Sequence, residues 1–260
     1  SLSEEMDIDP EYAALIVPTM VICKDFMDLF NAEALWMPGV SLLDGIAYDF
    51  GEKKNFIKSA HNFENDILVA ARNIAKRYST GKDHIKGTTD LALAIFDSMK
   101  KVHGMGDRER LLLQIAVQLH DCGKYISMGN VSECSYQIIM STDIIGLSSL
   151  ERQMIACAVR YNTSAFAYYD EIQNMGMAID RESYIKIAKM TAILRLANAM
   201  DRSHYQKVKG IKTVLKDREL QMIVDSSQDI SLELGLLKDK VAFFEEVFGI
   251  RLVLRRKGRA

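Results

Sequence analysis

A histidine and an aspartate stand side by side in this sequence, at His120 and Asp121, directly after the strongly apolar segment RLLLQIAVQL. An imidazole and a carboxylate next to each other at a helix end can face one cation, because the loss of helical geometry there frees the second side chain to turn inward. A divalent ion takes more than two ligands. The pair therefore predicts a metal site whose other ligands come from elsewhere in the chain.

Two further residues are candidates for the same site. His84 begins a helix predicted over HIKGTTDLALAIF, and Asp201 follows LRLANAM, where a carboxylate is costly to bury without a partner. A lone histidine or aspartate near a helix end is more often a cap or a solvated group. Because the residues occur in order on three helical segments, we predict one metal site formed by His84, His120, Asp121 and Asp201.

The elements that must position these residues are mostly helices. Apolar residues recur at three- and four-residue intervals in NDILVAARNIAKRY, HIKGTTDLALAIFDSMKKV, DRERLLLQIAVQLHD, SSLERQMIACAVRY and ESYIKIAKMTAILRLANAMD. After Gly210 the pattern changes, since IKTVLKD, ELQMIVD and IRLVLRR alternate apolar with polar residues, and DISLELGLLKDKVAFFEEVFG between them contains one more helix. The sequence thus predicts a mainly α protein that ends in a small α+β module.

The first 51 residues are predicted to be separate from this helical region. Asp9 and Pro10 are a plausible N-cap and first residue of a helix through EYAALIVPTMVICKDFMDLF, followed by a short strand at ALWM and a brief helix, SLLDGIAYDF, that ends near Gly51. The polar, mixed segment from Gly51 to Phe63 is a candidate linker or the start of an inter-domain helix.

Composition excludes several classes of protein. A chain of 260 residues that is 48% hydrophobic can form a sizeable core, and a net charge of −2 creates no overall field that favours nucleic acid or a membrane. The four cysteines include no C-x-x-C pair, which indicates reduced thiols, and neither a signal peptide nor an apolar run long enough to span a bilayer is present. We expect a cytoplasmic protein.

The order H…HD…D on helices resembles the HD superfamily of metal-dependent phosphohydrolases, in which these four residues bind the ion. Gly123 and Lys124 after the HD pair strengthen the match. A closer resemblance covers nearly the whole chain: ARNIAKRY, HIKGTTDLALAIFDSM, LLLQIAVQLHDCGKYIS, ERQMIACAVRY and LRLANAMDRSH, in this order, look like the C-terminal half of the Ppx/GppA family. Its members are exopolyphosphatases and guanosine pentaphosphate phosphohydrolases.

The resemblance implies a division into three parts. Residues 1–51 look like the C-terminal remnant of the family's second actin-like (ribonuclease H-like) domain, residues 52–205 like an HD-type helical domain, and residues 206–260 like the small α+β module. It also implies polyphosphate or a phosphorylated guanine nucleotide as the partner, and a homodimer. The family cleaves the terminal phosphate between two actin-like domains, and only isolated glycines such as Gly39, Gly45 and Gly51 occur here. We therefore expect that main catalytic cleft to be absent from these residues.

The chain departs from the family pattern inside the HD-type region. Where close relatives have histidines it has Asn130, Val131 and Glu133, and a further one is replaced by Asn162; no histidine lies between His120 and His204. The segment therefore cannot supply the extra imidazoles of a two-metal site. We expect a site for one ion, or a site that has lost its metal. Glu133 is a possible oxygen ligand, which favours Mg²⁺ or Mn²⁺ over zinc.

Several charged residues are candidates for contact with a substrate. Asp121 and Lys124 are the catalytic candidates, since the Lys124 ammonium can offset charge on a phosphate bound at the metal. Arg202 and His204 follow Asp201 in a tetrapeptide similar to one in the family, and they are predicted to hold a phosphate or to orient Asp201. Solvation of the lysine and attraction of the two cations to a helix C-terminus are the simpler interpretations.

Other basic residues are better explained as solvated surface. A polyphosphate chain would need a track of charges such as Lys53, Lys54, Lys58, Arg72, Lys76, Arg77, Lys82 and Lys86, but acidic neighbours dilute this run. The basic end of the chain, Arg251, Arg255, Arg256, Lys257 and Arg259, would discourage pairing at a sheet edge. His61 and His103 stand among polar residues, and we predict that both lie at the surface.

Three functions remain open at this level. The favoured one is the C-terminal part of a phosphoric anhydride hydrolase of the exopolyphosphatase type, with one divalent metal at the HD-type site. A non-catalytic module that binds polyphosphate or forms a dimer is the first alternative, and the missing histidines support it. The second is a free-standing HD-type hydrolase of nucleotides.

Overall fold

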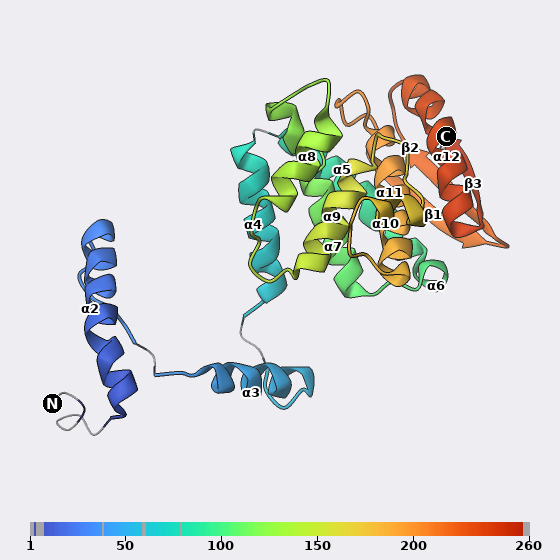
Figure 1. Cartoon of the computed structure of the whole chain (residues 1–260). Helices are drawn as coiled ribbons and strands as arrows, with labels where there is room; N and C mark the ends of the chain where they lie inside the picture. The colour runs from blue at the N-terminus through green and yellow to red at the C-terminus, as the bar shows by residue number, and fades with distance from the viewer. Residues whose placement is uncertain (1–2, 4–7, 38, 59–60, 79, 257–260) are drawn as a thin grey trace. The chain divides into compact units, whose positions relative to one another are not determined.

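The computed structural model describes residue 3 and residues 8–37, 39–58, 61–78 and 80–256 (Figure 1). Contacts between residues divide the chain once, into the units Ser1–His61 and Asn62–Ala260. The division falls inside the segment predicted as a linker. The finer boundaries at residues 51 and 205 stay a prediction.

The described part of the first unit contains helices α2 (Pro10–Phe30) and α3 (Leu42–Lys53). The Asp9 carboxylate caps α2 by accepting a hydrogen bond from the Glu11 amide at 2.8 Å, so the predicted cap is confirmed. The predicted strand at residues 34–37 is wrong, because no described residue of this unit forms a strand with which it could pair. None of the residues of α2 is buried within the unit.

The second unit is a helical body. Its helices are α4 (Phe63–Arg77), α5 (Lys82–Ser98), α6 (Lys100–His103), α7 (Asp107–Leu119), the 3-10 helix η1 (Cys122–Tyr125), α8 (Val131–Met140), α9 (Ser149–Arg160), α10 (Tyr169–Asn174) and α11 (Arg181–Met200). The five helical segments expected from apolar spacing are confirmed. Helices α8 and α10 were not predicted, since α8 is short and begins with the mixed segment VSECS, and α10 is too short to show a period.

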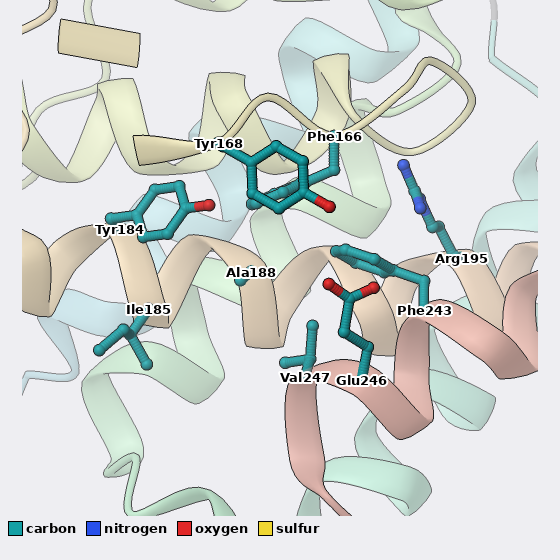
Figure 2. Close-up of a pocket in the computed structure, with 9 residues that line it drawn as sticks. All are labelled: Phe166, Tyr168, Tyr184, Ile185, Ala188, Arg195, Phe243, Glu246 and Val247. Carbon is teal, nitrogen blue, oxygen red and sulfur yellow. The ribbon is translucent and has the colours of Figure 1, made fainter. Parts of the chain in front are cut away.

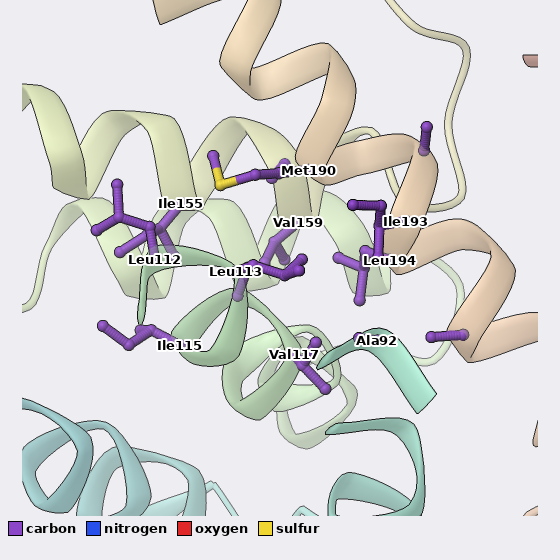
Figure 3. Close-up of a cluster of buried hydrophobic side chains, with 14 of the residues drawn as sticks. Ala92, Leu112, Leu113, Ile115, Val117, Ile155, Val159, Met190, Ile193 and Leu194 are labelled. Carbon is purple, nitrogen blue, oxygen red and sulfur yellow. The ribbon is translucent and has the colours of Figure 1, made fainter. Parts of the chain in front are cut away.

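Helix α7 lies at the centre of this body, where it contacts α4, α5, α9 and α11. Its side chains Leu113, Ile115 and Val117 are fully buried and interdigitate with apolar side chains of α5, α9 and α11 (Figure 3). Truncation of any such buried leucine or isoleucine to alanine typically costs about 2 to 5 kcal/mol. The C-terminal end of α7, which carries the HD pair, is therefore held firmly by packing.

A small sheet completes the second unit. It contains β1 (Gly210–Lys216), β2 (Glu219–Asp225) and β3 (Arg251–Arg256) in the order β1-β2-β3, with β1 antiparallel and β3 parallel to β2. Helix α12 (Ser231–Phe248) connects β2 to β3 and packs against α11, while β1 packs against α5. The prediction of a mainly helical chain with a small α+β end is confirmed. The basic edge strand is β3, whereas Lys257 and Arg259 lie outside the described residues.

A buried arginine links α11 to its surroundings. Arg195 Nε donates a hydrogen bond to the Tyr161 carbonyl at 2.8 Å and Nη2 donates one to the Ser164 carbonyl at 2.6 Å, with the guanidinium 4.3 Å from the centroid of the Phe243 ring. Figure 2 shows Arg195 reaching from α11 toward the loop that follows α9. A hollow of about 320 Å³ beside it is lined by residues that include Phe166, Tyr184 and Phe243. The arginine thus fastens this loop and α12 to α11.

The four cysteines are free thiols in the structure. No cysteine of the chain forms a disulfide, and burial raises the pKa of Cys122 to about 11 and that of Cys157 to about 12, so both stay protonated at neutral pH. Among the described residues, no helix is both long enough and apolar enough to cross a bilayer.

His61 is exposed as predicted, but the prediction for His103 is wrong. His103 is 1% exposed, its Nε2 donates to the Phe96 carbonyl at 2.9 Å, and its Nδ1 accepts from the Met105 amide at 2.9 Å. The ring packs against Phe96 because the short helix α6 turns it inward, which its polar sequence neighbours do not reveal.

The burial of His103 gives stability a pH dependence. Burial, with a smaller effect from the nearby Lys189, lowers its pKa below the ordinary value of 6.5, and a proton on Nδ1 would also remove the acceptor of the Met105 amide. The unfolded chain therefore binds a proton that the folded chain does not, and stability falls as pH drops from 6.5 toward 5, by at most about 1.4 kcal/mol per pH unit for this residue. Urea midpoints measured across this range in EDTA should show the slope.

A matched pair of variants isolates the contribution of His103. His103→Gln should unfold at lower urea at pH 7 and should show a shallower pH slope, while Lys101→Gln, at an exposed position of the same helix α6, should keep the wild-type slope. Equal slopes in the wild type and in His103→Gln would contradict the assignment.

Candidate metal centre

Three helices that pack on one another bring the predicted site residues together. His84 lies in the first turn of α5, His120 is the C-cap of α7 and Asp121 follows it, while Asp201 is the C-cap of α11. All four are buried, and α5, α7 and α11 contact one another in pairs. The convergence occurs because each residue stands at the end of its helix, on the side that faces the body.

Three of these side chains converge on one point. The Nε2 atoms of His84 and His120 lie 3.3 Å apart, and the Asp121 carboxylate approaches them at 3.8 and 3.5 Å respectively. Their potential ligand atoms all lie within 4.8 Å of one another. Such a spacing is compatible with one shared ion, since nitrogen and oxygen ligands stand about 2.0 to 2.2 Å from a small divalent metal.

Hydrogen bonds fix which nitrogen of each ring faces this point. His84 Nδ1 lies 2.7 Å from Asp201 Oδ2, and His120 Nδ1 lies 2.7 Å from the Val117 carbonyl oxygen. Because a carboxylate and a carbonyl can only accept, both Nδ1 atoms must donate, and the Nε2 lone pairs of neutral rings then face each other. A shared proton or a cation relieves this arrangement, so the donor set fits a metal ion.

Asp201 thus contacts His84 Nδ1, on the side of the ring that faces away from the point where His84, His120 and Asp121 converge. Its Oδ1 accepts from the Gln206 amide at 2.9 Å and its Oδ2 accepts from Gln206 Nε2 at 3.2 Å. Burial alone would raise the pKa of Asp201, but hydrogen bonds from His84 and Gln206 outweigh it and lower the pKa. The carboxylate stays ionised and orients His84; its role as a direct ligand stays a prediction.

Electrostatics set the protonation of the HD pair. Burial, together with the nearby His84, lowers the pKa of His120, which favours the neutral ring that ligates metals. Burial alone would raise the pKa of Asp121, but the hydrogen bond from Lys124 and its positive charge lower it. The Lys124 Nζ atom donates to Asp121 Oδ2 at 2.5 Å. A neutral imidazole and an ionised carboxylate are thus both available.

A buried serine shapes the turn that follows the HD pair. Ser135 Oγ, on α8, donates to the His120 carbonyl at 3.0 Å and accepts from the Gly123 amide at 2.8 Å. A Cβ atom added at Gly123 would lie 2.1 Å from the Val131 carbonyl oxygen and 2.6 Å from the Ser135 nitrogen. Only glycine lets α8 approach the turn this closely.

The structure also places the other three predicted site residues, His204, Arg202 and Glu133. His204 stacks on His84 with ring centroids 3.7 Å apart and 16° between planes, whereas Arg202 is exposed at the surface. Glu133 is engaged elsewhere, since its carboxylate accepts from Arg160 Nε at 2.8 Å and from Gln137 Nε2 at 3.1 Å.

Reasoning from sequence missed several residues that complete the site. Gln206, Ser135 and the Val117 carbonyl all hold site residues in place, and Thr88 Oγ1 lies 3.5 Å from His84 Nδ1. Thr88 has a usable signal, because it stands one helical turn after His84. The other contacts cross the fold and carry no local pattern.

The fold and the site define a helical domain with a buried His/His/Asp group at the junction of three helices. Residues 69–240, about two thirds of the chain, match the family model described as Ppx/GppA phosphatase, domain III. The chain belongs to the Ppx/GppA phosphatase family. No curated protein matches the sequence.

Substitution of Gly123 tests whether the close approach of α8 to the turn after Asp121 requires glycine. Gly123→Ala should destabilise the protein by about 1 to 3 kcal/mol, because the added methyl group collides with backbone atoms of α8 that cannot move independently. Urea unfolding followed by circular dichroism measures this. As the control, Gly235→Ala in α12 has open space at the added Cβ atom and should be neutral or stabilising by up to about 1 kcal/mol. Equal midpoints for wild type and Gly123→Ala would refute the packing argument.

Proposed function

We propose that this chain is the C-terminal part of an exopolyphosphatase or guanosine pentaphosphate phosphatase-like phosphohydrolase, and that its HD-type site binds one divalent ion, Mg²⁺ or Mn²⁺. The observation that carries the proposal is the convergence of two Nε2 lone pairs and one ionised carboxylate on a single buried point. A divalent cation is the group that satisfies all three at once.

A bound divalent ion supplies a Lewis acid that polarises a phosphoryl oxygen and lowers the pKa of water. Asp121 then has two duties, as a ligand and as an acceptor of the Lys124 ammonium. Release of Lys124 from that carboxylate would make its ammonium available to offset charge on a phosphate. His204, stacked on His84, and the exposed Arg202 lie on the same loop and are the proposed contacts for the substrate.

One ion is favoured over two. The chain has no histidine between His120 and His204, and Glu133, the proposed additional oxygen ligand, would have to leave Arg160 to reach the site. A hard ion is favoured if Glu133 does take part, since carboxylate oxygens suit magnesium and manganese.

The first 51 residues are proposed to be the remnant of an actin-like domain, preceding an HD-type helical domain at 52–205. Helix α2 exposes large apolar side chains, among them Leu29 and Phe30, and Trp36 after it is 85% exposed. Apolar surface of this extent usually packs against more protein. We propose that this apolar surface packs against the rest of the actin-like domain, where the family's main cleavage reaction takes place.

A non-catalytic module that binds polyphosphate or forms a dimer is the second candidate. Asn162, which replaces a histidine of relatives, is buried, and its Oδ1 has no hydrogen-bond partner in the described part of the chain. This buried, unpaired amide supports the interpretation that the metal site has lost part of its original set of ligands.

Metal binding separates the two candidates. After purification in Mn²⁺, the wild type should retain about one ion per chain by elemental analysis and by electron paramagnetic resonance, and Asp121→Asn should bind at least about tenfold more weakly. Asp83→Asn removes an exposed carboxylate one residue before His84 and should bind as the wild type does. Absence of stoichiometric metal in the wild type would reject the metal proposal.

The catalytic part is tested with inorganic polyphosphate and guanosine pentaphosphate as substrates. Phosphate release that requires Mn²⁺ and falls by at least about tenfold in Asp121→Asn and Lys124→Gln supports catalysis at this site. Binding of polyphosphate that weakens steeply with salt, without any release of phosphate, supports the non-catalytic module instead.

A further inference from the structure

A second cavity, of about 530 Å³, lies between α4 and α5 and is separate from the candidate metal centre. Its lining on α5 comes from residues 82, 85, 86, 89 and 90, which share one face of the helix by their three- and four-residue spacing. His84 and Thr88 are instead buried among α5, α7 and α11. The volume falls within the range of about 300 to 1,000 Å³ that is usual for small-molecule sites.

The innermost polar group of this cavity is the side-chain amide of Gln118. Gln118 belongs to the central helix α7 and is 5% exposed, and its Oε1 atom is buried with no hydrogen-bond partner among the described residues. An unsatisfied buried acceptor costs about 1 to 3 kcal/mol, so such groups usually have a partner. A ligand that carries a hydrogen-bond donor would supply one.

Four cationic side chains surround the same cavity. Arg72 and Lys76 come from α4, and Lys82 and Lys86 come from α5. Arg72 donates to two neutral acceptors, the Leu68 carbonyl at 3.2 Å and Asn65 Oδ1 at 3.4 Å.

Positive charge exceeds negative charge in the lining of this cavity. In the described part of the chain none of these four residues forms an ion pair, and Asp90 is the only acidic residue in the lining. Like charges around a concave surface add their potentials and attract an anion with several charges. The aliphatic stems of the lysines, with Ala75 and Ile85, leave the walls largely apolar.

We propose that this cavity binds a phosphorylated organic molecule of the nucleotide class, with its phosphates at the rim cations and a hydrogen-bond donor of its base or sugar at Gln118. The apolar walls suit a flat ring. An inorganic phosphate chain would pair with the cations equally well, but at neutral pH its oxygens accept hydrogen bonds and leave Gln118 Oε1 unsatisfied. The proposal does not depend on metal at the HD-type site.

Isothermal titration calorimetry of the full chain in EDTA, with guanosine diphosphate, adenosine diphosphate and inorganic tripolyphosphate as probes, tests this proposal. The wild type should bind at least one of the nucleotides. Lys82→Gln combined with Lys86→Gln should weaken it by about tenfold or more and reduce the dependence of affinity on salt. Lys101→Gln, which removes an exposed lysine on α6, is the control and should bind as the wild type does.

Gln118→Leu distinguishes the two kinds of ligand. It should weaken nucleotide binding by about tenfold, leave tripolyphosphate binding unchanged and raise the melting temperature of the free protein, because an unsatisfied buried acceptor is removed. If circular dichroism shows that Gln118→Leu does not fold, Gln118→Met takes its place. Failure of both nucleotides to bind at millimolar concentration overturns the proposal. Tripolyphosphate that binds as tightly as the nucleotides, with no effect of Gln118→Leu on either, also overturns it in favour of an inorganic chain.

Discussion

Two hydrogen bonds orient the histidine rings of the candidate metal centre, and the rest of the structure depends on them. One runs from His84 Nδ1 to Asp201 and the other from His120 Nδ1 to the Val117 carbonyl. Each fixes a neutral ring with its Nδ1 proton pointing outward, and so aims the Nε2 lone pair inward. Two lone pairs 3.3 Å apart, next to a carboxylate, form an arrangement that costs free energy until a positive charge joins it. Much of the surrounding structure serves to maintain this arrangement.

Packing supplies the rigidity that this arrangement needs. The buried side chains of α7 hold the end of the helix, and the contact of Gly123 with Ser135 on α8 fixes the path of the chain after Asp121. At the other side Gln206 holds the Asp201 carboxylate through two hydrogen bonds. Because ligands must be oriented to within fractions of an ångström, these contacts matter for metal affinity as much as for stability.

Helix α5 contributes side chains to two sites, the candidate metal centre and the cavity that ends at Gln118. Its inward face carries His84 and Thr88 to the candidate metal centre, and another face carries Lys82 and Lys86 to the cavity that ends at Gln118. The two faces differ in charge, since the metal centre gathers carboxylates and the cavity gathers cations. The proposed phosphorylated ligand and the proposed metal ion would occupy different sites in one domain, each suited by charge to its occupant.

The sequence by itself determined the helices, the small sheet and the order of the site residues, because three- and four-residue periodicity and two-residue alternation are local properties. Local order did not reveal that Asp201 would lie behind His84, a contact between residues 117 positions apart, or that α8 would support the HD turn. It also placed His103 at the surface and a strand at residues 34–37, since burial depends on how helices turn and a strand depends on a neighbour. Tertiary structure alone decided these points, because hydrogen bonds across the fold and burial arise only when distant segments meet.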